Sequence, residues 1–154
     1  MTLGALMVAI LLWLTVAGVR GGAFHGQLVN GLAQAFTDAG WSVAVEFPIR
    51  LPDGRTDWVD LLARRAERRL AIEVETTPRY VRVNVEKARL LGIPLLIAVP
   101  TRRLLAAIER RLAHRAAGAG ADSRILLYAQ LVQALRAGGV FDFPGECAGN
   151  GNGE

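Results

Sequence analysis

Cysteine, histidine and lysine are scarce in this sequence. Among its 154 residues there are one cysteine and two histidines, and Lys87 is the only lysine. The lone cysteine excludes a disulfide framework and a cysteine-based metal site. Neither His25 nor His114 has another histidine or a cysteine at ligand spacing, so both are interpreted as incidental. A Gly-rich phosphate-binding loop and a Ser-His-Asp arrangement are absent from the sequence too.

What the chain does have is arginine and a substantial hydrophobic content. The composition is 52% hydrophobic and 21% charged, which is typical of a folded protein, and the length suits one domain. Arginine supplies nearly all of the basic residues behind the net charge of +4. Guanidinium groups engage phosphate oxygens in pairs, which favours a nucleic-acid partner. A GC-rich genome that encodes Arg in place of Lys would give the same composition.

The first segment of the chain is uncharged. Residues 2–19 carry no ionisable side chain, and this length is the lower limit for a helix that crosses a bilayer. A signal peptide would begin with basic residues, and a buried core helix would show a polar stripe. We therefore predict an N-terminal apolar helix that anchors residues 1–20 in a membrane. Arg20 and the Arg-rich chain behind it place the domain in the cytoplasm by the positive-inside rule.

Hydrophobic periodicity predicts an α/β domain over residues 23–143. A first helix ends at Gly40, and a later one runs from Thr77-Pro78 to Leu91. Strands are expected at 41–51, 57–63, 70–76 and 95–99. A helix opening at Thr101, a loop at 116–123, a strand at 124–128 and a helix at 131–136 follow, and the tail at 144–154 is expected to be disordered. Because a strand–helix–strand order requires a parallel crossover, the sheet should be mixed, with helices on its faces.

Acidic side chains fall on the second and third predicted strands. A hairpin whose turn is centred in the Arg-rich segment sets Asp60 directly opposite Glu73, and opposed side chains are about 4.5–5.5 Å apart at Cβ. Because side chains alternate along a strand, Glu75 shares the face of Glu73, whereas Asp57 points away and caps the start of its strand beside Arg55. Such crowding is tolerable mainly when a cation neutralises it, and an all-oxygen ligand set favours Mg²⁺ or Mn²⁺. The alternative is a charged, solvated sheet face without a metal.

These acidic positions resemble the signature of the PD-(D/E)XK nuclease superfamily. The string Asp60-Leu61-Leu62, with Ile72-Glu73-Val74-Glu75 following it, is similar to the motif of that superfamily. Its members include restriction enzymes, archaeal Holliday junction resolvases and nucleases of mobile elements. Their common core is helix, three antiparallel strands, helix, strand, which matches the element order predicted for residues 24–100. The resemblance therefore implies a restriction-endonuclease-like mixed sheet flanked by helices.

One position departs from the motif. The superfamily usually has Lys where this chain has Glu75, although some restriction enzymes carry Glu there and other members move the lysine to the following helix. Lys87 is predicted on that helix, in a stripe with Tyr80 and Asn84 beside the core stripe, so it can approach the acidic centre. The Glu-Val-Glu-Thr-Thr string and the Asn-x-x-Lys helix also resemble nuclease domains of mobile elements. Otherwise, Lys87 is an ordinary surface lysine paired with an acidic neighbour.

The resemblance implies a role for each of these residues. Asp60 and Glu73 would hold Mg²⁺ (or Mn²⁺) together with the Val74 carbonyl, and the metal would bind the scissile phosphate and activate a water. Glu75 would be a third ligand or the base that orients this water. Lys87 would stabilise the negative charge of the transition state.

Further contacts are expected around this centre. Gln27, on the first helix, occupies the region where some relatives place a Glu, and it could contact a metal-bound water. Phosphate contacts are expected at the hairpin tip and on the following helix, from Arg64, Arg65, Arg68, Arg69 and Asn84.

The sequence thus favours a membrane-tethered, Mg²⁺-dependent DNA endonuclease. An inactive relative that binds nucleic acid or a protein partner is the alternative, because Glu75 stands in place of Lys. A third interpretation is a membrane-associated interaction domain unrelated to nucleases. If the protein cuts both DNA strands, the resemblance implies a homodimer.

Overall fold

The computed structural model describes residues 22–113 and 123–138, which form an α/β domain around a mixed sheet. The strands lie in the order β1-β2-β3-β4-β5. β1 pairs with β2 and β2 with β3 in antiparallel fashion, whereas β3–β4 and β4–β5 are parallel. The elements are α2 (Ala23–Asp38), β1 (Ser42–Arg50), β2 (Thr56–Arg65), β3 (Arg68–Val74), α3 (Val81–Leu91), β4 (Leu95–Val99), α4 (Arg102–Ala113), β5 (Ser123–Leu127) and α5 (Tyr128–Arg136). The predicted helix-flanked mixed sheet is confirmed.

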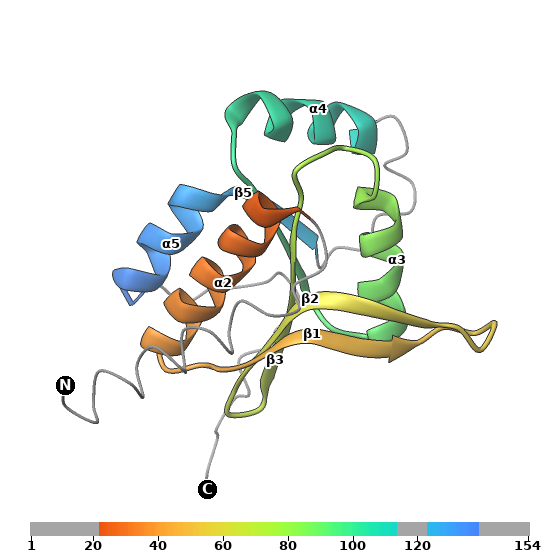
Figure 1. The fold of residues 1–154 in the computed structure, drawn as a ribbon, viewed down its shortest axis with the longest axis horizontal. Helices are drawn as coiled ribbons and strands as arrows, with labels where there is room; N and C mark the ends of the chain where they lie inside the picture. The colour runs from red at the N-terminus through yellow and green to blue at the C-terminus, as the bar shows by residue number, and fades with distance from the viewer. Residues whose placement is uncertain (1–21, 114–122, 139–154) are drawn as a thin grey trace, which may run out of the picture.

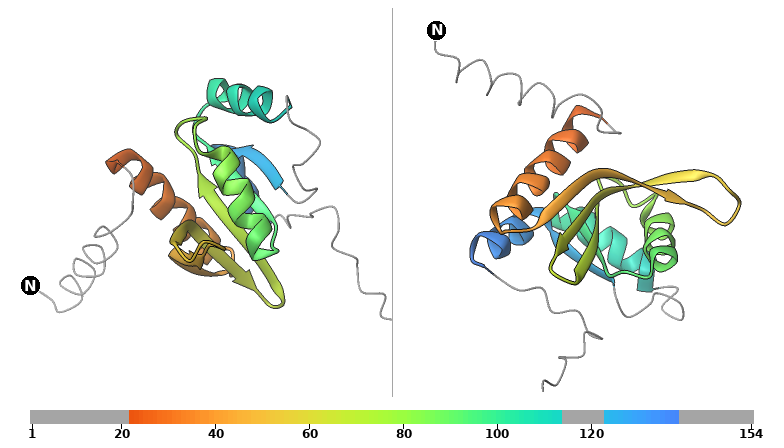
Figure 2. Two further views of the ribbon diagram at one scale, coloured as in Figure 1. Left: turned by 90° about the vertical axis from the view of Figure 1, so that its right-hand side faces the viewer. Right: turned by 90° about the horizontal axis from the view of Figure 1, so that it is seen from below.

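Helices cover the two faces of the sheet in pairs. α2 and α5 lie side by side over one face, and α3 lies over the other (Figures 1 and 2). The first face buries Leu32 and Phe36 of α2 with Leu131 of α5. The second buries Val81 of α3 and Ile108 of α4. β4 is buried along its whole length because both its faces are covered, as its unbroken apolar run predicts.

The helix ends follow the predicted signals only in part. Gly40 and Gly92 have φ angles of +83° and +62°, left-handed values that favour glycine, and Gly92 caps α3 as expected. The predicted start of that helix at Thr77-Pro78 is wrong. α3 begins at Val81 with Tyr80 as its N-terminal flanking residue, because residues 76–80 turn the chain from the end of β3 onto the face of the sheet. Tertiary position here outweighs the local capping signal.

The β2–β3 hairpin has the predicted register from Leu61 to its tip, although the ladder does not extend to the predicted Asp60–Glu73 pair. Leu61 pairs with Ile72, and the pairing continues to the tip, where Arg65 pairs with Arg68. β2 extends beyond its predicted end to Arg65, and β3 begins at Arg68 and ends at Val74, two residues earlier than predicted at both ends, so the four tip arginines belong to the ladder and not to a connecting loop. Only Ala66 and Glu67 form the turn, with Ala66 at φ +50°.

The regular alternation of β2 breaks at Asp60. Val59 and Leu62 pack in the same core cluster, although an unbroken pleat would put them on opposite faces. The β1–β2 ladder pairs residues on either side of this point but does not pair Glu46 with Asp60, and Glu46 has φ +50°. The parity argument that set Asp57 and Asp60 on opposite faces therefore does not hold for this strand.

A close approach of α2 and α5 supplies a stability prediction. A Cβ added at Gly31 would lie 2.2 Å from the hydroxyl oxygen of Tyr128 and 3.6 Å from its Cζ. Displacing Tyr128 costs about 1–3 kcal/mol, as overpacking does, whereas alanine gains about 1 kcal/mol of helix propensity over glycine, so Gly31→Ala should lower the free energy of unfolding by up to about 2 kcal/mol, measured by urea denaturation. Adding Tyr128→Phe removes the clashing oxygen and should restore most of the loss. A Gly31→Ala variant as stable as the wild type would contradict this packing.

Several predicted segments fall outside the described residues. They are the N-terminal anchor (1–20), most of the loop at 116–123, His114 and the tail (144–154). None of the helices within residues 22–113 and 123–138 is long and apolar enough to cross a membrane. At the loop's edge, Ser123 already begins β5, and Tyr128 begins α5 where a strand residue was predicted.

Candidate active site

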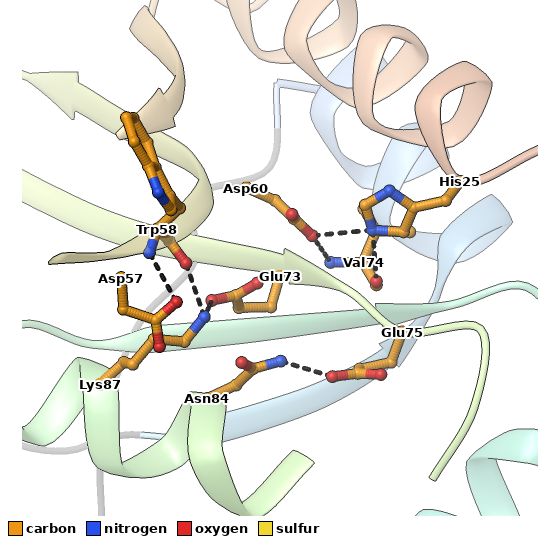
Figure 3. A network of polar contacts seen from close by, with 9 residues as sticks. All are labelled: His25, Asp57, Trp58, Asp60, Glu73, Val74, Glu75, Asn84 and Lys87. Carbon is orange, nitrogen blue, oxygen red and sulfur yellow. Dashed lines mark hydrogen bonds and ion pairs between the residues drawn. The ribbon is translucent and has the colours of Figure 1, made fainter. Parts of the chain in front are cut away.

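Asp60 lies in the middle of β2, where the start of α2 meets the end of β3. Its Oδ2 accepts a hydrogen bond of 2.8 Å from the backbone N–H of Val74. His25 of α2 brings its Nε2 to 3.2 Å from the same oxygen and to 3.0 Å from the Val74 carbonyl oxygen. These contacts gather three chain segments around one carboxylate (Figure 3).

The interpretation of His25 as incidental is therefore wrong. A histidine that ligates a metal often has a second histidine or a cysteine close by in sequence, whereas the partner of His25 is Asp60, which is distant in sequence. A usable signal was present, because His25 continues the apolar stripe of the first helix. It precedes Val29, Leu32 and Phe36 at helical spacing, and all three are buried. A half-buried histidine at the end of such a stripe must find a polar partner on the element beneath it.

Lys87 reaches the acidic centre from α3, as predicted. Its Nζ lies 2.7 Å from Glu73 Oε1 and donates a hydrogen bond of 2.6 Å to the Trp58 carbonyl. The side chains of Lys87 and Glu73 are only 8% and 5% exposed, so the alternative of an ordinary surface lysine is wrong. The ammonium is held between β2 and β3 (Figure 3).

Glu75 forms the third part of the cluster. It follows β3, donates its backbone N–H to Ala98 of β4 at 2.9 Å, and is buried. The side-chain amide of Asn84 donates a hydrogen bond to its carboxylate. Asn84 was expected at the nucleic acid, but it is buried against Glu75 and positions this acid instead. Tyr80, the first residue of the predicted stripe, is 52% exposed.

Crowding of the acids changes their protonation. Burial, and then the negative charge of Asp60, raise the pKa of Glu73 to about 8, although Lys87 opposes the shift. Burial and Asp60 likewise raise the pKa of Glu75 to about 7. The cluster therefore holds more negative charge than one lysine compensates, and an additional cation would lower these pKa values.

This crowding predicts how stability depends on pH. The pKa of Glu73 rises from 4.5 to about 8 on folding, so its contribution to stability is present below pH 4.5 and is lost as the pH rises through 8. Without divalent ions, the free energy of unfolding should fall between pH 5 and 8, measured by urea denaturation in EDTA. Glu73→Gln, which cannot ionise, should flatten this slope. An unchanged slope in that variant would show that Glu73 ionises normally.

Two carboxylates and one backbone carbonyl of the cluster are oxygen donors of the kind that Mg²⁺ and Mn²⁺ bind. Asp60 and Glu73 offer carboxylates from adjacent strands, and the Val74 carbonyl faces the same region (Figure 3). Within the described part of the chain, no group of three or more His, Cys, Asp or Glu side chains is close enough to hold a metal by side chains alone. A site here therefore has to include the backbone carbonyl and water, which suits Mg²⁺ and Mn²⁺.

The remaining predicted residues lie outside this cluster. Gln27 is exposed on α2. The place at the acidic centre that was expected for Gln27 is taken by His25, two positions earlier on the same helix. Asp57 accepts a hydrogen bond of 2.8 Å from the Trp58 N–H and lies near Lys87 (Figure 3). At the hairpin tip, Arg64 lies over the Phe47 ring at 5.9 Å. The tip arginines are all exposed: Arg64, Arg65, Arg68 and Arg69.

Comparison with known proteins does not identify a family for this chain. No protein-family model matches the sequence, and no curated protein matches it. Among solved structures, the chain is similar to the crystal structure of a protein of unknown function, AF1548, at 10% sequence identity and a TM-score of 0.46. The match covers 71% of this chain and 66% of that chain. At this level of likeness, function has to be argued from the geometry of the site.

Proposed function

We propose that the domain is a divalent-cation-dependent DNA endonuclease with a restriction-endonuclease-like fold, related to the PD-(D/E)XK superfamily. The observation that supports this most is the meeting of Asp60, Glu73, the Val74 carbonyl and Lys87 between two adjacent strands. The acids come from β2 and β3, and the lysine from the helix that follows β3. This combination provides ligands for Mg²⁺ or Mn²⁺ and a positive charge for a phosphate in one place.

In the proposed reaction, a water oxygen attacks the scissile phosphorus and the bond to the leaving oxygen breaks. A divalent ion held by Asp60, Glu73 and the Val74 carbonyl would supply positive charge at the phosphate and lower the pKa of the water. Glu75 accepts the proton of the attacking water, since a cation beside it would lower its raised pKa and keep the carboxylate ionised near neutral pH. Asn84 holds this carboxylate in place. The leaving oxygen takes a proton from solvent.

Lys87 has the role of the lysine that the motif lacks at position 75. Its ammonium already lies 2.7 Å from Glu73, next to the position where the phosphate would bind. A fixed positive charge there stabilises the extra negative charge of the transition state more than that of the bound substrate. Because α3 supplies the lysine, Glu75 is free to act as the base.

The competing proposal is an inactive relative that binds nucleic acid or a protein partner. The observation that favours it is the engagement of Lys87, which is both paired with Glu73 and hydrogen-bonded to the Trp58 carbonyl. A lysine held in this way can serve the fold alone. The basic hairpin would then retain DNA binding without cleavage.

A cleavage assay separates these proposals. Full-length protein in detergent is incubated with supercoiled plasmid, with Mg²⁺ or Mn²⁺ and with EDTA. A nuclease gives nicked or linear DNA only with the divalent ion. Salt-dependent DNA binding without any cleavage would support the inactive relative, and the absence of both would favour the unrelated interaction domain.

The arginines of the hairpin tip are proposed as the phosphate contacts. Arg64 stands opposite Arg69, and Arg65 opposite Arg68, and like charges directly opposite each other destabilise a ladder unless an anion lies between them. The double variant Arg64→Ala, Arg69→Ala should weaken DNA binding and reduce the slope of log K against log salt by about 2. Fluorescence anisotropy at several salt concentrations measures both quantities.

A matched pair of arginines provides the control for net charge. Arg110 and Arg111 are exposed on α4, and their replacement by alanine removes the same charge from another surface. If both double variants change the salt slope equally, the effect is one of overall charge and the hairpin is not the contact surface.

Membrane attachment and dimerisation are proposed on the sequence alone. Residues 1–20 would hold the protein in the membrane with the domain on the cytoplasmic side, and double-strand cleavage would use a homodimer. Recovery of the full-length protein in the soluble fraction without detergent would contradict the anchor. Light scattering of the detergent-solubilised protein, with and without DNA, tests the dimer.

A further inference from the structure

A surface at the start of α3 lies close to the acidic cluster. Tyr80 precedes this helix, and its carbonyl accepts the backbone N–H groups of Val83 and Asn84 at 2.9 and 3.1 Å. Asn84, in turn, contacts the carboxylate of Glu75 (Figure 3). Because one helical turn advances about 5.4 Å along the axis, Tyr80 lies about one turn from the residue that holds this acid. A ligand bound at Tyr80 is therefore a close neighbour of the cluster.

The surface around Tyr80 is aromatic, apolar and basic. Tyr80 is 52% exposed, and Val83, one turn along α3, is 50% exposed. The guanidinium of Arg79 lies over the Tyr80 ring, 5.3 Å from its centroid. Arg79 and Arg82 are both exposed. The first turn of α3 has no acidic residue and no side-chain cap, so its N–H groups add partial positive charge. We call Arg79, Tyr80, Arg82 and Val83 the Tyr80 surface.

An unpaired nucleotide matches the Tyr80 surface in both of its parts. Its base has a flat face that stacks on an aromatic ring, and an arginine beside the ring adds to this attraction. Its phosphates suit guanidinium groups and the N–H groups of a helix start. A base inside a duplex has to leave the stack before it can lie on Tyr80, which costs free energy. The surface therefore favours unpaired over paired strands.

The burial of the acidic cluster favours the same kind of strand. Glu73, Glu75 and Lys87 are only 4%, 5% and 7% exposed. The side chains of His25 and Asp60 are more open, at 16% and 18%, but solvent still reaches little of the cluster. An unpaired strand turns easily about its backbone bonds and can present one phosphate to so small an area. A duplex is stiff over this length, and bending it costs free energy.

We propose that the Tyr80 surface binds an unpaired base and that the substrate is DNA with unpaired nucleotides, such as a single strand or the arm of a fork. The inference rests on the proposed function for cleavage, and adds to it the class of DNA. Tyr80 stacks on the base, and Arg79 and Arg82 contact the phosphates on either side. The strand then continues from the start of α3 towards Glu75.

The test measures DNA binding by fluorescence anisotropy, with full-length protein in detergent and in EDTA so that no DNA is cut. The probes are a single strand of about 15 nucleotides, the length that one such surface and its flanks can occupy, and a blunt-ended duplex of the same sequence. The wild type should bind the single strand at least about 10-fold more tightly than the duplex. Tyr80→Ala should weaken single-strand binding by about 5- to 100-fold, as the loss of one base–aromatic stack does, and leave duplex binding unchanged.

Two control variants show whether the ring itself is responsible. Tyr80→Phe keeps the ring and should bind the single strand as the wild type does. Leu90→Ala shortens another exposed side chain, 40% exposed at the other end of α3, and should change neither affinity. A single strand that contains 2-aminopurine reports stacking directly. Its fluorescence should fall on binding to the wild type and to Tyr80→Phe, but much less with Tyr80→Ala. Circular dichroism and thermal unfolding establish that each variant is folded.

The outcomes separate this inference from the proposed function. If the wild type binds the duplex as tightly as the single strand, or if Tyr80→Ala binds the single strand as the wild type does, the inference is wrong, and the cleavage assay decides the nuclease proposal independently. If Tyr80→Ala loses single-strand binding but no form cleaves DNA with Mg²⁺ or Mn²⁺, the Tyr80 surface is confirmed and the nuclease proposal is wrong. Tighter binding of single-stranded RNA of the same sequence would overturn DNA as the substrate.

Discussion

Asp60→Asn should reduce DNA cleavage by at least about 100- to 1,000-fold while leaving DNA binding intact or tighter. Asparagine has nearly the same shape, and its amide oxygen can still accept the hydrogen bond from the Val74 N–H, which is 2.8 Å long in the wild type. The substitution removes the negative charge that a divalent cation needs, so catalysis should fail while the fold persists. Binding can tighten because one carboxylate that repels the phosphate backbone is lost.

Asp57→Asn is the matched control for this experiment. Asp57 lies on the same strand, and its carboxylate accepts a hydrogen bond from the neighbouring Trp58 N–H. Single-turnover cleavage at saturating DNA should be close to wild type for Asp57→Asn. If Asp57→Asn abolishes cleavage and Asp60→Asn does not, the first acidic position has been assigned to the wrong residue.

Lys87→Met should lower the rate of cleavage at saturating DNA by about 100-fold or more, with little change in DNA affinity. Methionine fills a similar volume but has no charge, so the transition state loses the ammonium beside Glu73. The same change leaves Glu73 buried without its partner, at 4% exposure, and removing one partner of a buried pair costs about 3–5 kcal/mol. Protonation of Glu73, whose pKa is about 8, reduces this cost at neutral pH.

Two further variants separate catalysis from folding. Lys87→Met combined with Glu73→Gln removes the pair together and should recover much of the stability without recovering cleavage. The double variant Arg65→Ala, Arg68→Ala should do the opposite, weakening DNA binding while cleavage of bound DNA continues. If Lys87→Met is folded and cleaves at the wild-type rate, α3 does not supply the missing lysine.

The hairpin register illustrates what the sequence could predict. The alternation of side chains along β3 determines which residues share a face, and the turn at Ala66 and Glu67 determines which residues pair across the hairpin. Leu61 therefore pairs with Ile72. The approach of Lys87 to the acidic centre followed from helical spacing together with the superfamily resemblance, in which some members carry the lysine on this helix. Local patterns are sufficient where one face of an element is buried.

The errors arise where tertiary contacts overrule local rules. The apolar stripe of α2 indicates that His25 faces the sheet, but its contact with Asp60 depends on how α2 packs over β2 and β3. Asn84 shares the stripe of Lys87 as predicted, but the depth of burial of that stripe depends on how closely α3 approaches β3. The break of the pleat at Asp60 coincides with the positive φ of Glu46 on the neighbouring strand, and a glutamate gives no warning of such a conformation.

Each of the two helical layers contributes one side chain to the acidic cluster. His25 arrives with the layer of α2 and α5, and Lys87 with the layer of α3 and α4. A partly folded chain that had docked only one layer would lack either the imidazole or the ammonium. A cation that binds the completed site would favour the native state by mass action, by about 2.7 kcal/mol at 100 times its dissociation constant. A bound cation would thus stabilise the packing of both helical layers on the sheet, and a chelator that removes it would lower the free energy of unfolding of both layers together.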